Sequence, residues 1–203
     1  AAVLVLLLVM VGSFGMWDLM MQTLAIVSGA VLISIAMGIP IGIIMASNKK
    51  VDAFLRPVLD AMQTMPSFVY LVPALMFFGL GKVPGLFATL IYALPPVIRL
   101  TSLGINMVPE DVIEAGRAFG ATKMQLLLKI QLPLAMPSIM TGINQTTMMA
   151  LAMVVIASMI GARGLGEQVL ISIGRIDVGR GLEAGLSIVA LAIVIDRLLQ
   201  GIG

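Results

Sequence analysis

The sequence contains no cysteine and no histidine. These absences exclude disulfide bonds, thiol nucleophiles, haem ligation and most zinc sites, so we expect no metal site and no bound cofactor. Charged residues are also scarce, at 11% of 203 residues, against about 25% in an average soluble domain. The net charge of +2 is small and the aromatics lie in no basic patch, so we expect no nucleic-acid partner.

Long apolar runs dominate the sequence, which is 60% hydrophobic and has a mean hydropathy of +1.14. Several runs approach the roughly 20 residues that a helix needs to cross a bilayer. Backbone groups in lipid must be satisfied within each span. We therefore expect an all-α, polytopic membrane helical bundle of about five or six transmembrane helices, forming a single domain over residues 1–203. The expected apolar segments are residues 1–12, 20–46, 58–80, 84–105, 132–160 and 184–202.

The first apolar run has no initiator Met and no basic flank. We interpret it as the remainder of a truncated helix and not as a signal peptide. Gly38 and Gly42 stand four residues apart in the second run, a spacing that predicts close packing against another helix.

If consecutive spans alternate in direction, most of the basic residues fall on one side of the membrane. Loops 47–57 and 106–131 and the C-terminus, with Arg99 near its helix end, hold eight of the twelve Lys and Arg. The other side holds Lys82, Arg163, Arg175 and Arg180. The positive-inside rule therefore places the first side in the cytoplasm and loop 161–183 outside.

The most charged stretch, EAGRAFGATKMQLLLKIQLPLAMP, covers residues 114–137. Pro109 followed by acids predicts a helix start with proline at the first helical position, and Glu114 and Arg117 are spaced to pair.

Gly120 suits a left-handed helix end. Thr122 and Gln125 form a capping box for a second helix, 123–130. Pro133 and Pro137 are expected to redirect the chain as it re-enters the membrane. Residues 107–131, called the elbow below, thus form a cytoplasmic bend.

The elbow can be an ordinary amphipathic interfacial loop, but its spacing is specific. Glu114-Ala115-Gly116, three residues, Gly120, nine residues and Ile130-Gln131-Leu132-Pro133 resemble the EAA signature of ABC-importer permeases, with Gly116 where the pattern prefers Ala. That smaller residue is expected to loosen the helix slightly.

The resemblance implies a type I permease fold and a multi-pass place in the bacterial cytoplasmic (inner) membrane. It implies that the elbow docks on an ATPase subunit, with Arg117 on a polar rim and Phe119 as an apolar anchor. The docking residues implied are Glu114, Ala115, Gly116 and Gly120, and the residues that fix the junction to the membrane helix are Ile130, Leu132 and Pro133.

The chain cannot hydrolyse ATP by itself, because it has no GxxxxGK[ST] loop and Gly79-Leu80-Gly81-Lys82 has the wrong spacing. The resemblance therefore implies that two copies of a partner ATPase use ATP and Mg²⁺, and that this chain is not an enzyme.

The resemblance is nearest to glycine betaine/proline betaine permeases. It runs through residues 59–85, 93–109, 129–166 and 192–197, for example LDAMQTMPSFVYLVPALMFFGLGKVPG and ALPPVIRLTSLGINMVP. It implies a dimer of permeases, an external substrate-binding protein and a small quaternary ammonium substrate, with choline or a methylamine oxide as alternatives.

A quaternary ammonium is best held by an aromatic cage, and no aromatic cluster is evident, so we expect a weak translocation path. Its candidates, for which interhelical hydrogen bonding is the alternative role, are Gln63, Thr64, Asn144, Gln145, Thr146 and Thr147. The Met residues 148, 149, 153 and 159 suit an adaptable lining or simple packing. Gly161, Gly164 and Gly166 are candidates for an outer gate or a plain turn.

Two other classes are considered. A secondary transporter or channel would carry intramembrane charges or inverted repeats. The prolines within the spans could produce the broken helices of such a transporter, but no buried charge is evident. An intramembrane enzyme would need His, Cys or paired acids, which are missing from the spans.

Overall fold

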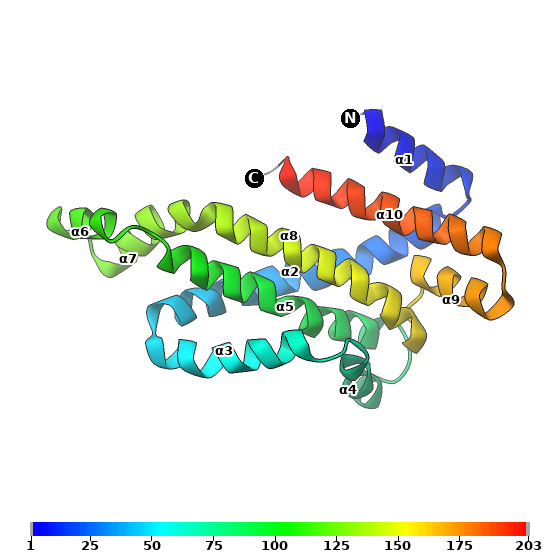
Figure 1. Ribbon diagram of the computed structural model, residues 1–203, viewed down its shortest axis with the longest axis horizontal. Helices are drawn as coiled ribbons and strands as arrows, with labels where there is room; N and C mark the ends of the chain where they lie inside the picture. Colours follow the sequence, from blue (N-terminus) through cyan, green and yellow to red (C-terminus); the bar gives the residue numbers. More distant parts are fainter. Residues whose placement is uncertain (1, 202–203) are drawn as a thin grey trace. The chain divides into compact units, whose positions relative to one another are not determined.

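The computed structural model describes residues 2–201, and this range folds into helices joined by short turns, with no β-strand within it. The expected all-α class is confirmed. The elements in chain order, labelled in Figure 1, are α1 (Ala2–Ser13), α2 (Trp17–Ser47), α3 (Lys49–Thr64), α4 (Phe68–Phe78), α5 (Lys82–Asn106), α6 (Glu110–Ala118), α7 (Lys123–Leu126), the π-helix η1 (Leu127–Gln131), α8 (Leu132–Ala157), the 3₁₀-helix η2 (Ser158–Ile160), α9 (Leu165–Arg175) and α10 (Val178–Gln200).

Three of the described helices are long and apolar enough to cross a membrane, or four if α3 and α4 count as one bent span. The three are Trp17–Ser47, Lys82–Asn106 and the continuous run Lys123–Ile160. The expected continuous helix over 58–80 is wrong, because the helix breaks between α3 and α4, which meet at 98°. Pro66 lies in the break and disfavours helical geometry at Met65, the residue before it.

The helices form two compact groups, described separately here; the expected single domain over 1–203 stays a prediction. Within the described residues, group 1 comprises 2–33, 65–93 and 147–201. In it α10 packs against both α1 and α9 (Figure 1). Its fully buried side chains include Met16, Met20, Val27, Met153 and Leu165.

The expected outer loop at 161–183 is largely helical, which corrects that expectation. It contains α9 and the first turn of α10, joined at Ile176 and Asp177. The buried residues of α9, Leu165, Gly166 and Ser172, recur at helical spacing along one face. The charges around them concealed this amphipathic pattern.

Group 2 comprises residues 34–64 and 94–146. Its core has two clusters, one around Met45, Leu59 and Ile98 and the other around Ile105, Ala135 and Ile139. The close packing expected at the second-run glycines is confirmed. A Cβ on Gly42 would lie 2.7 Å from the carbonyl oxygen of Ile98 and from Thr101 Cβ, and a Cβ on Gly38 would collide with Val97.

Candidate functional site

The first helix of the elbow, α6, begins directly after Pro109. Pro109 is the residue before α6, with φ −56° and ψ 138°, so the proline precedes the first helical position and does not occupy it. Glu110 and Asp111 lie in the first turn of the helix and Arg117 in its last turn, which suits the helix dipole. The expected Glu114–Arg117 ion pair is not among those formed by residues 2–201.

The helix end at Gly120 has the expected left-handed geometry. Gly120 has φ +77°. Its N–H donates to the carbonyl of Arg117 at 2.9 Å, and the N–H of Ala121 donates to that of Gly116 at 3.1 Å. These two bonds form a Schellman motif, which needs a residue that tolerates positive φ. The chain therefore turns back sharply after Phe119.

The capping box at the start of the second elbow helix is also confirmed. The N–H of Gln125 donates to Thr122 Oγ1 at 3.3 Å, and the N–H of Thr122 donates to Gln125 Oε1 at 2.8 Å. The two donors at the start of α7 are thus satisfied by side chains. α6 and α7 lie side by side at one end of group 2 (Figure 1).

Gly116 is where the two halves of the elbow meet. A Cβ at this position would lie 2.7 Å from Leu126 Cδ2 and 2.8 Å from Ile130 Cδ1. Glycine therefore allows a closer contact between α6 and the following helix than alanine would. The departure from the EAA pattern has a packing reason, which sequence alone did not reveal.

The outer surface of α6 is open. No residue of α6 is buried, and the side chain of Phe119 is 93% exposed. Glu114 and Ala115 are exposed as well. Arg117 and Lys123 line a cavity of about 370 Å³ together with Ser47, Asn106 and Gln131. The elbow thus presents acids, small residues and one aromatic ring, a mixture that suits contact with another protein.

The helix continues through Pro133 and Pro137 without a break, which corrects the expected redirection. Residues 123–160 form one continuous helical run, and both prolines lie inside α8. The π-helix η1 precedes Pro133, with the N–H of Leu132 donating to the carbonyl of Leu127. A π-turn widens the helix where a proline cannot donate a backbone hydrogen bond. The second elbow helix thus continues through Ile130 and Leu132 into α8.

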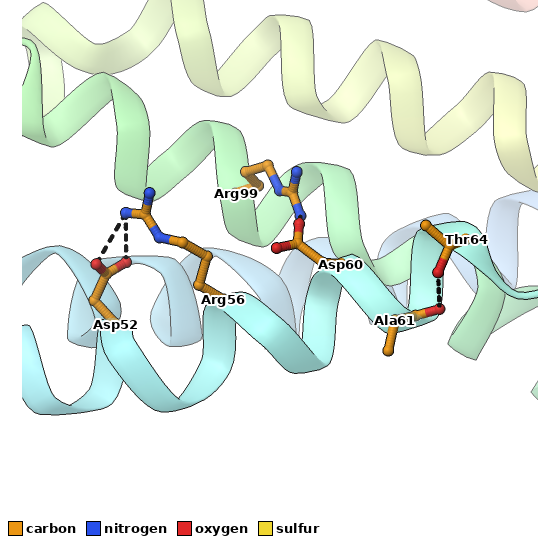
Figure 2. Close-up of polar contacts among 6 residues, drawn as sticks. All are labelled: Asp52, Arg56, Asp60, Ala61, Thr64 and Arg99. Atoms are coloured by element: carbon orange, nitrogen blue, oxygen red, sulfur yellow. Dashed lines mark hydrogen bonds and ion pairs between the residues drawn. The ribbon is translucent and has the colours of Figure 1, made fainter.

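Sequence reasoning missed a second polar site in group 2, shown in Figure 2. Arg99 of α5 forms an ion pair with Asp60 of α3, while Arg56 pairs with Asp52 one turn earlier on α3 at 2.9 Å. A cavity of about 310 Å³ lies here, lined by Met45, Arg56, Asp60, Arg99, Ser102, Leu103 and Asn106. Asp60 and Arg99 are 39 residues apart in sequence, so no local spacing signals them. The available signal was Arg99 itself, a charge seven residues before the end of the apolar helix α5.

The expected path residues fall on two elements, Gln63 and Thr64 on α3 and the others on α8. Gln63, Thr64 and Gln145 are exposed, and Thr146 is fully buried. Thr64 donates its hydroxyl to the carbonyl of Ala61 at 3.1 Å (Figure 2). Met149 is half-buried on α8. Their role in translocation stays a prediction.

The three outer glycines lie where the chain turns from η2 into α9. Gly161 and Gly164 have φ +84° and +154°, and a Cβ on Gly164 would lie 2.5 Å from Thr23 Oγ1. The N–H of Leu165 donates to that hydroxyl oxygen at 2.9 Å. A Cβ on Gly166 would lie 2.8 Å from the Cα of Val155. Positive φ thus explains Gly161, and close packing explains Gly164 and Gly166; a gating role stays a prediction.

Comparison with known proteins gives a consistent picture. The model of a family described as "Binding-protein-dependent transport system inner membrane component" matches residues 38–202. The chain is 57% identical to the glycine betaine/proline betaine transport system permease protein ProW of Escherichia coli (strain K12), over 97% of this chain and 55% of that protein. It is 54% identical to the glycine betaine transport system permease protein OpuAB of Bacillus subtilis (strain 168), over 93% of this chain and 67% of that protein.

The chain therefore spans about half the length of the ProW relative. Among solved structures, the fold resembles a chain of the inward-facing MetNI methionine ABC transporter, with a TM-score of 0.79, 22% identity and coverage of 90% of this chain and 93% of that chain. This likeness supports the fold.

Proposed function

This chain belongs to the family of binding-protein-dependent transport system inner membrane components, and from that premise we propose that it is the permease subunit of an ATP-driven importer of small quaternary ammonium osmolytes. The observation that carries the proposal is the 57% identity to a betaine permease over 97% of the chain. The same membership argues against the secondary transporter or channel considered above.

The importer requires partners that this chain does not contain. We propose two ABC ATPase subunits, which use ATP and Mg²⁺, a second copy of this permease and an extracytoplasmic substrate-binding protein. The substrate class follows the ProW and OpuAB relatives, which are named for the transport of glycine betaine and, for ProW, proline betaine. The chemistry of ATP hydrolysis belongs to the partner, so this subunit is not an enzyme by itself.

The elbow is the proposed contact with the ATPase. Glu114 is exposed on α6 and Phe119 is exposed directly after it, and the Schellman turn at Gly120 fixes the direction in which that helix ends. The contact of Gly116 with Leu126 and Ile130 joins this helix to the run that continues into α8. A displacement of α6 by the ATPase is thereby passed to a membrane helix.

Two substitutions test this function in vesicles that contain the full importer. Gly120→Val forces a β-branched residue into left-handed geometry, at a cost of about 1–2 kcal/mol, and Glu114→Lys reverses an exposed charge. We expect either variant to insert normally but to lose about tenfold of substrate-stimulated ATP hydrolysis. Gly15→Val is the matched control, since Gly15 has φ +68° outside the elbow and, like Gly120, no atom within 4 Å of its Cβ position.

Full stimulation in the elbow variants would overturn the docking assignment. Uptake of labelled glycine betaine that persists in wild-type vesicles without ATP, or that follows an ion gradient, would overturn the importer itself.

A further inference from the structure

The cavity beside Arg99 holds a particular set of charges. Its volume of about 310 Å³ lies at the small end of the range of about 300–1,000 Å³ seen for ligand sites. Two arginines and one acid line it, with Met45 and Leu103 as apolar walls. All of these residues belong to group 2.

One of the two arginines already has a partner on its own helix. Arg56 Nη2 donates to both carboxylate oxygens of Asp52, at 2.9 and 3.1 Å, and Asp52 is not part of the lining. The other arginine, Arg99, reaches from α5 to Asp60 on α3 (Figure 2). The cavity therefore presents one cation and one anion in contact, with no net charge between them.

This pair is accessible. The side chains of Arg99 and Asp60 are 38% and 55% exposed, so both charges can exchange their partner for a solute without large desolvation. Gln63 and Thr64, two of the candidate path residues, lie three and four residues after Asp60 on α3. Residues at these spacings share a helix face.

We propose that this cavity is a transient binding site for a zwitterion that carries a quaternary ammonium and a carboxylate. The proposal rests on the transport function above and specifies its substrate class. Arg99 donates N–H bonds to the carboxylate of the solute, a geometry that guanidinium groups favour. Asp60 faces the quaternary ammonium, which has no N–H to donate and is held by charge alone. Met45 and Leu103 offer apolar contact to the methyl groups.

The ion pair explains how the site can be empty and still stable. Without a solute, Asp60 and Arg99 neutralise each other. When a zwitterion enters, each side chain exchanges its partner for the opposite end of the solute, and the charge of the cavity stays unchanged. A monocation such as choline would contact Asp60 but offer no carboxylate to Arg99, so it makes one of the two contacts that a zwitterion makes, and the site favours the zwitterion.

The site is expected to bind weakly. Its charges are partly exposed, which limits each contact, and its lining contains no aromatic ring to hold an ammonium by cation–π attraction. Weak binding suits a path, because a solute has to leave it again.

Binding is tested on the purified permease–ATPase complex without its binding protein. Saturation-transfer NMR follows the methyl protons of three probes: glycine betaine, tetramethylammonium and acetate. We expect a signal for glycine betaine that exceeds those of both fragments. Arg99→Gln and Asp60→Asn should weaken it about tenfold, because each removes one of the two charges that contact the solute. Lys50→Gln is the matched control, since it removes an exposed charge of α3 outside the lining, and should leave the signal unchanged.

The selectivity of one variant separates recognition from a structural role. In Arg99→Gln the lone Asp60 carboxylate should bind tetramethylammonium more strongly than wild type does, while glycine betaine binding falls. A merely structural ion pair predicts that both signals fall together, and that result would overturn the proposal, as would unchanged betaine binding in both variants. ATP-driven uptake by the wild-type importer is measured in parallel, so a failure of the general transport function is recognised separately.

Discussion

At the scale of single residues, Gly116 shows how a departure from a sequence pattern can have a structural cause. The EAA pattern prefers alanine, and helix propensity alone favours alanine over glycine by about 1 kcal/mol. The side chains of Leu126 and Ile130 occupy the space that a methyl group would need. Since both contacts are made by the ends of flexible side chains, Gly116→Ala should be close to neutral, as the two effects oppose each other.

A larger residue at position 116 should be clearly harmful. Gly116→Val adds a branched side chain where 2.7 Å is available, and overpacking of this kind costs about 1–3 kcal/mol. We expect a lower midpoint of thermal unfolding in detergent. Gly185→Val provides the comparison, because it lies inside α10 with no atom within 4 Å of its Cβ position. Equal midpoints for the two variants would show that the contact with Leu126 and Ile130 is unimportant.

At the scale of elements, the features that the sequence predicts are those made by neighbouring residues. The capping box at Thr122 and the left-handed turn at Gly120 involve groups at most five residues apart, so their spacing reveals them. The helix start near Pro109 was predicted to within one residue for the same reason. The helical composition of the fold follows equally from the apolar runs.

The features that the sequence does not predict depend on contacts between residues far apart in the chain, or are hidden within long apolar runs. Apolar residues on both sides of Met65–Ser67 read as one span, although the chain turns by 98° there. The π-helix before Pro133 keeps the chain helical where the proline suggested a bend. The Asp60–Arg99 pair joins residues 39 positions apart, and only the three-dimensional structure brings them together.

The packing of α9 on α10 can be tested by a disulfide. A Cβ on Gly181 would lie 3.3 Å from Ser172 Cβ, close to the Cβ separation of about 3.5–4.5 Å in disulfides. Because the chain has no cysteine, Ser172→Cys with Gly181→Cys creates a single defined pair. We expect it to form on mild oxidation, and tryptic fragments cut at Arg175 or Arg180 should stay joined until reductant is added.

The control for this disulfide is Gly174→Cys with Gly181→Cys, since the Cβ position of Gly174 has no atom within 4 Å. Fragments of this control should separate without reductant. If the two pairs behave alike, the contact between Ser172 and Gly181 is not the one described.

At the scale of the whole molecule, the length of one helix relates the elbow to the bilayer. Residues 123–160 form a continuous run of 38 residues, which at about 1.5 Å per residue is roughly 57 Å long. The hydrocarbon core is only about 30 Å thick. The run is therefore long enough for its α7 end, with Lys123 and Lys129, to extend beyond the hydrocarbon into water. The positive-inside rule places that end in the cytoplasm, where ATP is available.

The same rule places α9 on the opposite side of the membrane, and labelling in intact cells tests both assignments. Met124→Cys and Ile173→Cys replace side chains that are 63% and 69% exposed, in a chain without native cysteine. A membrane-impermeant maleimide should label Ile173→Cys from outside, and Met124→Cys only after permeabilisation. A partner protein that covers position 124 could also prevent labelling, so labelling in denaturing detergent is the control that shows the cysteine to be reactive once it is uncovered. Labelling of Met124→Cys in intact cells would place the elbow outside, where no ATPase could dock on it, and the proposed coupling would then be impossible.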